Sequence, residues 1–282
     1  MQTIFIVGAG TMGSGIAQVA AQSGFSVRLY DISTQQLERA RATISANLDR
    51  LVKKEKLTAA DKDATLARIA TATQLDGVAA ADLVIEAASE NEALKLELFA
   101  KLDALAKPEA ILAPNTSSIS ITKIAAATKN PARVIGMHFF NPVPVMALIE
   151  LIRGLQTSDE TYQKAEAIAK ALGKTPVAVK NSPGFVVNRL LCPMINEAIF
   201  ALQEGLASAE GIDEAMKLGC NHPIGPLALA DLIGLDVELA VMQVLYEGFK
   251  DPKFRPAPLL VEMVEAGRLG RKTGEGFYRY DR

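Results

Sequence analysis

The feature that most restricts what this chain can fold into is a set of three glycines near its N-terminus. Gly8, Gly10 and Gly13 have the spacing G-x-G-x-x-G, directly after the β-branched run Thr3–Val7 and before a helical pattern over Ser14–Gln22. A glycine-rich turn between a strand and a helix is typical of phosphate binding, because the backbone comes close to an anion and the first N–H groups of the helix point at it. The spacing by itself is common, and an ordinary tight turn is the alternative. The flanking strand and helix favour a dinucleotide site.

Each position of this glycine loop has its own expected role. Gly8 permits the tight turn, Gly10 lets the backbone approach a pyrophosphate, and Gly13 lets the helix pack closely against the strand. Thr11 and Met12 lie between Gly10 and Gly13 and are also expected to bind the cofactor. The sequence therefore predicts a Rossmann-type βαβ unit at the start of the chain.

An acidic residue follows the second expected strand. Asp31 lies 18 residues beyond Gly13, close to the offset of about 20 at which an acid accepts hydrogen bonds from the ribose hydroxyls. A carboxylate there repels a 2′-phosphate and favours NAD over NADP, although Arg28 nearby could rearrange to meet such a phosphate. Asp31 as the N-cap of the next helix is the alternative interpretation, and it is compatible with the first.

Short apolar runs alternate with helical patterns through the first two thirds of the chain, as in parallel βαβ units. Their continuous hydrophobicity predicts strands that are covered on both faces. A long helix is expected from about Gln35 to Lys56. The expected strands are Thr3–Val7, Ser26–Tyr30, Asp82–Glu86, Ala110–Ala113, Arg133–Met137, Leu148–Leu151 and Pro176–Val179.

The pattern changes at a breaker cluster, Asn181-Ser182-Pro183-Gly184, after which amphipathic helical segments replace the strand-like runs. We therefore predict an α/β protein of two domains. An N-terminal Rossmann-type domain with a mostly parallel sheet, which binds NAD, would span residues 1–182. An all-helical domain would span residues 183–282, and the family resemblance described below implies that it serves dimerisation and substrate binding.

Charge and cysteine content argue against several classes of protein. The 30 Lys and Arg residues are balanced by 32 Asp and Glu, a net charge of −2, so a nucleic-acid partner is not expected. Cys192 and Cys220 lie outside any C-x-x-C pattern, which argues against a disulfide framework and a thiolate metal site and favours the cytoplasm. The apolar stretch Val134–Ile152 contains His138 and Glu150, so no membrane span is expected.

Only two histidines are available for acid/base chemistry. We expect His138 to follow the strand that ends at Met137, at the carboxyl edge of the sheet where ligands bind. Glu150 lies in a run that looks buried, and a carboxylate there needs a partner. The two side chains are a plausible proton-transfer pair, with a satisfied core histidine as the alternative. His222, in a proline-rich loop, is assigned no chemistry.

Six stretches, in the same order along the chain, carry a family resemblance. They are Gly8–Gly13, Asn115–Ser118, His138–Pro142, Asn181–Arg189, Gly225–Leu227 with Asp231, and Gly267–Tyr278. With them the chain resembles the L-3-hydroxyacyl-CoA dehydrogenases, and within that family the bacterial 3-hydroxybutyryl-CoA dehydrogenases. The resemblance implies hydride transfer between NAD(H) and a 3-hydroxyacyl-CoA or 3-ketoacyl-CoA, in fatty acid metabolism.

The resemblance also implies roles for single residues. His138 would be the general acid/base and Glu150 its orienting partner, while Ser117 and Asn188 would bind the reacting oxygen of the substrate. Asn115 would lie against the nicotinamide. Two further residues would border the cofactor pocket, Glu90 and Lys95.

Two of these residues have a second interpretation. Ser117 follows the strand around Leu112 and is expected at the same sheet edge as His138, but it could instead cap the helix near Ser120–Ala127. Asn188 follows the breaker cluster, where its amide could bind substrate or make a hydrogen bond between domains.

Lys53, Lys54 and Lys56 lie at the end of the long helix. The resemblance places this helix near the nucleotide of coenzyme A, whose phosphates would pair with the lysines. A solvated helix end is the alternative.

The helical domain is unusually apolar over Phe185–Leu202 and Ile224–Leu245. One small domain hides part of this surface, and the resemblance implies that a second copy of the chain hides the rest in a homodimer. Packing on the first domain alone is the alternative. Rival functions are a sugar-acid dehydrogenase of the same architecture and a nucleotide-binding protein without catalysis.

Overall fold

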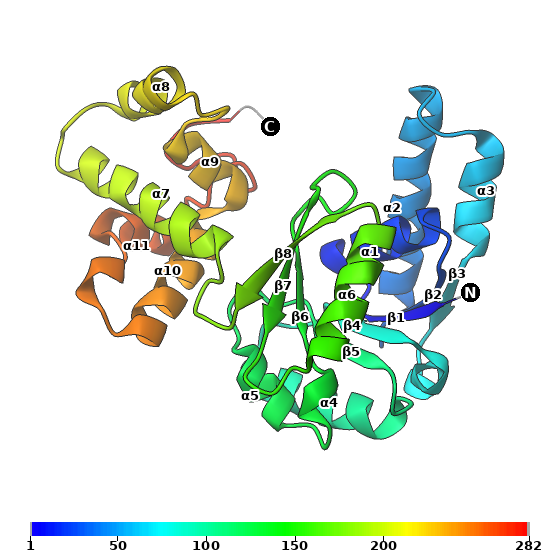
Figure 1. Cartoon of the computed structure of the whole chain (residues 1–282). Coiled ribbons are helices and arrows are strands. Elements are labelled where there is room, and N and C mark those ends of the chain that lie inside the picture. The colour runs from blue at the N-terminus through cyan, green and yellow to red at the C-terminus, as the bar shows by residue number, and fades with distance from the viewer. Residues whose placement is uncertain (1, 281–282) are drawn as a thin grey trace. The chain divides into compact units, whose positions relative to one another are not determined.

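The computed structural model describes residues 2–280 (Figure 1). The chain divides after Ser182 into two compact units, Met1–Ser182 and Pro183–Arg282. We call these the first and the second unit and describe each by itself.

A five-stranded parallel sheet forms the centre of the first unit, with strand order β3-β2-β1-β4-β5. This confirms the predicted α/β class. The order reverses between β1 and β4, and such a switch point is where open parallel sheets bind ligands. The strands are β1 Thr3–Val7, β2 Ser26–Tyr30, β3 Ile69–Ala72, β4 Leu83–Glu86 and β5 Ile111–Pro114.

Helices connect these strands. Because such crossovers are right-handed, the connections from β1 to β2 and from β2 to β3 lie on one face of the sheet, and the connection from β4 to β5 lies on the other face. The helices are α1 Thr11–Gln22, α2 Thr34–Lys53, α3 Ala59–Ala67, α4 Glu92–Leu105, α5 Ile121–Ala126 and α6 Asp159–Ala171, with short 3₁₀ turns η1 Leu75–Ala80 and η2 Pro131–Arg133. Leu37, Ala40, Ile44 and Leu48 recur at helical spacing and bury one stripe of α2 in the core.

The long helix ends three residues earlier than the sequence pattern predicted. Lys54 is the C-cap of α2, and Glu55 takes the left-handed conformation with φ 56°. Lys56 therefore lies in the turn before α3 rather than on the helix. Apolar spacing continues through Leu57, which packs on the core from the turn, and this explains the overestimate.

The last three strands form a separate sheet instead of extending the parallel one. They are β6 Gly136–Phe139, β7 Leu148–Arg153 and β8 Thr175–Lys180, in the order β6-β7-β8. β6 and β7 pair antiparallel, and β7 and β8 pair parallel. A single bridge between Leu112 and Val134 links this sheet to β5. His138 thus lies within β6, whereas the sequence pattern placed it after the strand.

The second unit is built from helices: α7 Val187–Gln203, α8 Ala209–Cys220, α9 Pro226–Ile233, α10 Leu235–Phe249, the 3₁₀ turn η3 Pro252–Phe254 and α11 Pro258–Glu265. Ile195, Ile199 and Leu227 belong to its main apolar core. A smaller core around Met242 and Leu245 lies between α7, α10 and η3.

Asp231 anchors the C-terminal segment of this unit to α9. Its buried carboxylate accepts hydrogen bonds from the Phe277 and Tyr278 N–H groups at 2.9 and 3.0 Å and from the Tyr280 hydroxyl at 2.9 Å. Burial and this carboxylate raise the pKa of Tyr280 to about 12. A Cβ on Gly276 would lie 1.9 Å from the Asp231 carboxylate, so glycine is required there.

No helix within residues 2–280 has the length and apolar character that crossing a bilayer requires. The apolar stretch Val134–Ile152 contains β6, a loop and most of β7.

Candidate active site

The glycine loop has the shape that a pyrophosphate needs. Gly8 has φ 98°, and a Cβ there would lie 2.7 Å from the Ala88 Cα. A Cβ on Gly13 would lie 1.8 Å from the Gly8 carbonyl oxygen, whereas one on Gly10 would meet nothing within 4 Å. The loop is thus closed on the strand side and open beside Gly10, the N-cap of α1. These residues fit a dinucleotide whose phosphates meet the start of α1.

Asp31 is tied to this loop. Its Oδ2 accepts a hydrogen bond from the Ala9 N–H at 2.9 Å, while the Gln36 amide donates to the Ala9 carbonyl at 3.1 Å. Both the N–H and the carbonyl group of Ala9 are therefore held by hydrogen bonds. The N-cap of α2 is Ser33, whose hydroxyl accepts from the Gln36 N–H, so the interpretation of Asp31 as the N-cap is wrong.

A cavity of about 420 Å³ lies beside the loop, with mostly apolar walls. It would take the adenosine half of a dinucleotide, because an apolar slot with a carboxylate at its rim suits an adenine and a ribose. The Arg28 side chain packs over Gly77 of η1. Arg28 is not among the residues that line this cavity. The lining residues include Gly8, Tyr30, Asp31, Ile32, Leu75, Glu86, Ala88, Ser89, Leu94 and Lys95.

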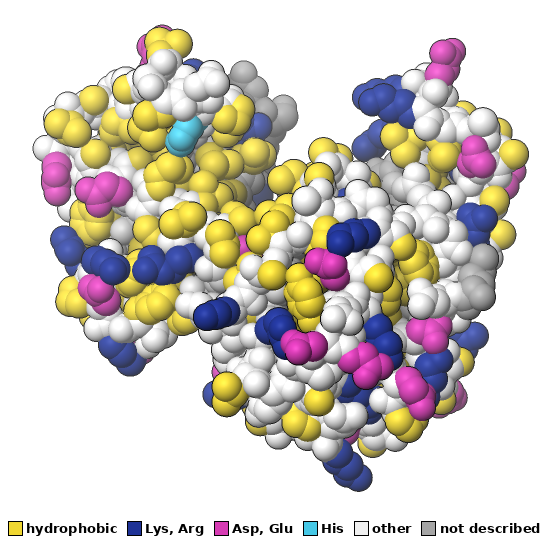
Figure 2. All heavy atoms as spheres, viewed as in Figure 1, with side chains coloured by type: hydrophobic (Ala, Val, Ile, Leu, Met, Phe, Trp, Pro, Cys, Tyr) yellow, Lys and Arg dark blue, Asp and Glu magenta, His cyan; other side chains and the backbone are white. Residues whose placement is uncertain are grey.

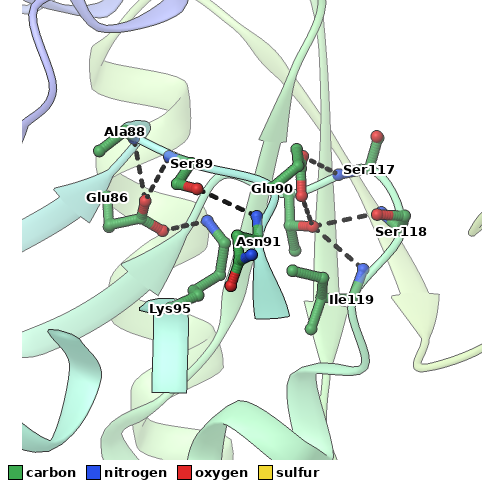
Figure 3. A network of polar contacts seen from close by, with 10 residues as sticks. Glu86, Ala88, Ser89, Glu90, Asn91, Lys95, Ser117, Ser118 and Ile119 are labelled. Carbon is green, nitrogen blue, oxygen red and sulfur yellow. Dashed lines mark hydrogen bonds and ion pairs between the residues drawn. The ribbon is translucent and has the colours of Figure 1, made fainter. Parts of the chain in front are cut away.

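A buried ion pair joins Lys95 of α4 to Glu86 at the carboxyl end of β4 (Figure 3). Both side chains are fully buried. The other Glu86 oxygen accepts from the Ala88 and Ser89 N–H groups at 2.9 and 3.3 Å, so the pair also shapes the turn that packs against Gly8. The sequence analysis missed Glu86. An acid ending the otherwise apolar run Leu83–Ile85 was the available signal, as it was for Glu150.

Glu90 holds the turn after β5 (Figure 3). Its carboxylate accepts from the Thr116 hydroxyl at 2.7 Å and from the Ser117 N–H at 3.1 Å. The Ser120 hydroxyl, not that of Ser117, caps α5 by accepting from the Lys123 N–H. The interpretation of Ser117 as the helix cap is therefore wrong.

Asn115 connects the same turn to the second sheet. Its buried side-chain oxygen accepts a hydrogen bond from the Phe139 N–H at 3.0 Å. Because Phe139 is the neighbour of His138 in β6, this bond fixes the turn that carries Ser117 next to the strand that carries the histidine.

His138 and Glu150 face each other across the antiparallel β6–β7 pair. The His138 Nδ1 lies 2.7 Å from a Glu150 carboxylate oxygen, and the two residues are 7% and 1% exposed. The Phe140 ring packs against the imidazole with 4.5 Å between ring centroids. A buried carboxylate at Nδ1 makes that nitrogen the proton donor of the pair and leaves proton exchange to Nε2.

A second cavity, of about 200 Å³, lies between the glycine loop, α2 and the loop after β6. Arg39, Thr43 and Asn47 line it from successive turns of α2, and Asn141 to Pro144 line it from the loop. Lys53 and Lys54 lie farther along the same helix and are exposed, as is Lys56 in the following turn.

Asn188 belongs to the second unit, where it lies in the first turn of α7. Among residues 2–280, no three His, Cys, Asp or Glu side chains converge as ligands for a metal ion.

Two family models match the chain. The model described as "3-hydroxyacyl-CoA dehydrogenase, NAD binding domain" matches residues 3–182. The one described as "3-hydroxyacyl-CoA dehydrogenase, C-terminal domain" matches residues 184–280.

Curated relatives are similar over nearly their full length. A 3-hydroxybutyryl-CoA dehydrogenase from Bradyrhizobium diazoefficiens is 54% identical, over 99% of this chain and 96% of its own length. A probable 3-hydroxybutyryl-CoA dehydrogenase from Deinococcus radiodurans is 55% identical, over 98% of this chain and 99% of its own. The crystal structure of (S)-3-hydroxybutyryl-CoA dehydrogenase from Ralstonia eutropha matches with a TM-score of 0.98 at 63% identity, covering all of both chains.

Proposed function

This chain belongs to the 3-hydroxyacyl-CoA dehydrogenase family and is an NAD-dependent oxidoreductase, and we propose that it interconverts (S)-3-hydroxybutyryl-CoA and acetoacetyl-CoA. The observation that carries the proposal is the buried His138–Glu150 pair, in the same unit as a glycine loop that fits a dinucleotide. The butyryl chain length is taken from relatives that are more than 50% identical.

In the oxidation direction, His138 acts as the general base and takes the proton of the substrate's 3-hydroxyl group at Nε2. Glu150 stabilises the imidazolium that forms and keeps the ring oriented. Ser117 and Asn188 donate hydrogen bonds to the substrate oxygen as it becomes a carbonyl. Bound NAD supplies the acceptor for the hydride that leaves C3. In the reverse direction His138 returns the proton to the ketone oxygen.

The residues that hold NAD in this proposal surround the glycine loop. Gly8, Gly10, Thr11, Met12 and Gly13 take the pyrophosphate, and Asp31 takes the ribose of the adenosine. Asn115 lies against the nicotinamide. Glu90 and Lys95 act on the cofactor pocket through the turns that they fix, since their polar atoms bond to the chain itself.

The cavity beside α2 suits the acyl-CoA substrate. Its polar stripe of Arg39, Thr43 and Asn47 runs along α2 toward Lys53 and Lys54. From Asn47 to Lys54 the helix rises about 10 Å, within the reach of an extended pantetheine. Figure 2 shows Lys and Arg side chains gathered at the tip of the α2–α3 hairpin, where the phosphates of coenzyme A would lie.

Replacing Lys53, Lys54 and Lys56 together by alanine is expected to raise KM for acetoacetyl-CoA by roughly 5- to 20-fold at low salt, since each exposed charge pair contributes about 0.2–1 kcal/mol. The difference from wild type should shrink in 0.5 M salt because the charges are screened. KM for NADH should not change. The matched control replaces the exposed Lys164, Lys170 and Lys253, and an equal rise in KM there would contradict the assignment.

We propose a cytoplasmic homodimer formed through the second unit. Figure 2 shows hydrophobic side chains over much of the visible face of this unit. An exposed apolar surface of this kind is typical of a subunit interface. The thiols of Cys192 and Cys220 are free, as expected in a reducing compartment. Exposed large apolar residues of this unit are Val186, Leu190, Leu206, Leu218, Leu232, Val237 and Tyr246.

Leu190→Glu is expected to convert the dimer into a monomer at micromolar concentration, because it buries a charge at an apolar interface. Light scattering coupled to size-exclusion chromatography measures the mass. Leu155→Glu, at an exposed position of the first unit, is the control and should stay dimeric. A monomeric wild type would refute the proposed dimer.

The direct test of the reaction is oxidation of NADH on addition of acetoacetyl-CoA, with NADPH in parallel. If acetoacetyl-CoA causes fast oxidation of NADH but not of NADPH, the result supports the proposed substrate pair and the role of Asp31 in selecting NAD over NADP. Protein that binds NADH but turns over only a sugar acid would support the sugar-acid alternative. NADH binding without turnover of either substrate would support a non-catalytic nucleotide-binding protein.

A further inference from the structure

Lys174 is a buried lysine with an unusual set of partners. It lies between α6 and β8, directly after Gly173, and is 9% exposed. Its ammonium donates to the Val143 carbonyl at 2.5 Å and to the Met146 carbonyl at 2.7 Å. Within residues 2–280 no carboxylate lies within salt-bridge distance of it. Burial lowers the pKa of Lys174, so two carbonyl dipoles must offset the lost hydration.

The carbonyls belong to the loop of residues 140–147, which joins the strand of His138 to the strand of Glu150. The Thr175 N–H donates to the Ala147 carbonyl at 2.8 Å, so three loop carbonyls are held from one short segment. Within the loop, the Val145 and Met146 N–H groups both donate to the Pro142 carbonyl. A lysine ammonium has three N–H donors and no acceptor, so it can bind several carbonyl oxygens that point toward the same place.

The clamped loop packs against the start of α1. Val143 is buried, and a Cβ on Gly15 would lie 2.9 Å from the Val143 Cβ. The next residues of the loop turn outward, with Val145 75% exposed. Lys174 thus holds the Val143 part of the loop against α1, the helix that begins in the glycine loop. Most other residues of the loop face away from the core.

The loop also forms one wall of the cavity beside α2, opposite Gly10 and Thr11. On the proposed function, this cavity takes the acyl-CoA. We infer that Lys174 is a positioning residue for substrate binding, which acts through the backbone of residues 140–147 to keep the acyl-CoA cavity formed. It touches neither the reacting atoms nor the His138–Glu150 pair, so its loss weakens substrate binding and spares the proton transfer.

The test compares steady-state kinetics of wild type and Lys174→Met in acetoacetyl-CoA reduction. We expect KM for acetoacetyl-CoA to rise about 10-fold or more, as for loss of a charge-assisted bond, with kcat within about threefold of wild type. The dissociation constant for NADH, from fluorescence titration, should change much less than KM for acetoacetyl-CoA, because the cofactor meets this cavity only at the glycine loop. Lys174→Arg keeps charged donors and should restore most of the affinity. Lys170→Met, on the exposed end of α6, is the matched control and should behave as wild type.

An unchanged KM in Lys174→Met overturns the inference. So does a parallel loss of kcat, NADH binding and thermal stability that Lys174→Arg fails to relieve, because that pattern marks a role in folding only. If Lys174→Met does not fold, Val143→Ala takes its place. It leaves the ammonium bonds intact and removes the two Val143 methyl groups, one of which packs beside Gly15, while the Cβ stays in place. A smaller rise in KM in the same direction is expected, and an unchanged KM again overturns the inference. A wild type that does not oxidise NADH with acetoacetyl-CoA would refute the proposed function instead.

Discussion

Replacing His138 by glutamine is expected to lower kcat/KM for acetoacetyl-CoA by roughly 10²–10⁴-fold, the usual contribution of a positioned general acid or base. Glutamine fills a similar volume and can still bond to Glu150, but it cannot transfer a proton at the position of Nε2. NADH binding should not change, because His138 lies on β6 and not in the glycine loop. Stopped-flow measurement of NADH oxidation at saturating cofactor gives the rate.

The chain supplies a matched control in its other histidine. His222→Gln, in the second unit, should leave the rate unchanged. Glu150→Gln keeps the 2.7 Å contact but removes its charge, and the rate should fall roughly 10- to 100-fold because the imidazolium loses its partner. If both residues act in one proton transfer, the double variant should be little worse than His138→Gln alone. Near-wild-type turnover of a folded His138→Gln would refute the assignment.

The second large effect concerns the stability of the helical unit. Glu238 on α10 is completely buried, and neither carboxylate oxygen has a nitrogen or oxygen partner within the part of the chain that the structure describes. Burial raises the pKa of Glu238 to about 8 from its ordinary 4.5, although the Cys192 thiol beside it lowers the pKa in part. The folded unit therefore holds this carboxyl in its neutral form.

The sign of the pH dependence follows from the raised pKa. Below pH 4.5 the group is protonated in both states, and the folded unit has its full stability. As the pH rises the unfolded chain releases the proton first, so stability is lost progressively until about pH 8. The total loss is on the order of 5 kcal/mol. Glu238→Met removes the carboxyl group and with it this loss of stability. The free energy of unfolding of the variant should therefore exceed that of wild type by a margin that grows from pH 5 to pH 9.

Urea unfolding followed by circular dichroism, at one protein concentration and three pH values, measures this margin. Glu247→Met is the matched control, because Glu247 lies on the same helix but is exposed and pairs with Lys250. Its effect should be small and nearly independent of pH. A margin for Glu238→Met that stays constant with pH would contradict the buried neutral carboxyl.

Features with strong local rules were predictable from the sequence. The glycine loop needs specific residues at fixed spacing, and Asp31 directly follows a strand that must pair next to β1, so both could be located without coordinates. The helical character of the second unit follows from the apolar periodicity after Pro183. Glu150 was found because an acid between Ile149 and Leu151 needs a partner.

Features that depend on pairing between segments were harder to predict. β3 has four residues, Ile69–Ala72, of which only Ile69 is buried, so it lacks the apolar run that marks the other strands. The direction of β6 against β7 has no signature in composition, because both strands are buried and read alike. Glu86 could have been noticed as an acid at the end of an apolar run, but no sequence motif identifies Lys95, nine residues later and across a turn, as its partner in a buried ion pair.

The antiparallel register of β6 and β7 determines which changes of chain length this protein can tolerate during evolution. Because successive side chains of a strand alternate in direction, an insertion or deletion of one residue inside either strand would turn His138 or Glu150 to the opposite face and separate them. Length changes between residues 140 and 147 leave the strand pairing intact and act instead on the wall of the cavity and on the contacts that hold this loop. Natural or engineered changes in the length of this loop would therefore change which acyl-CoA substrates are accepted. The His138–Glu150 pair would stay in place.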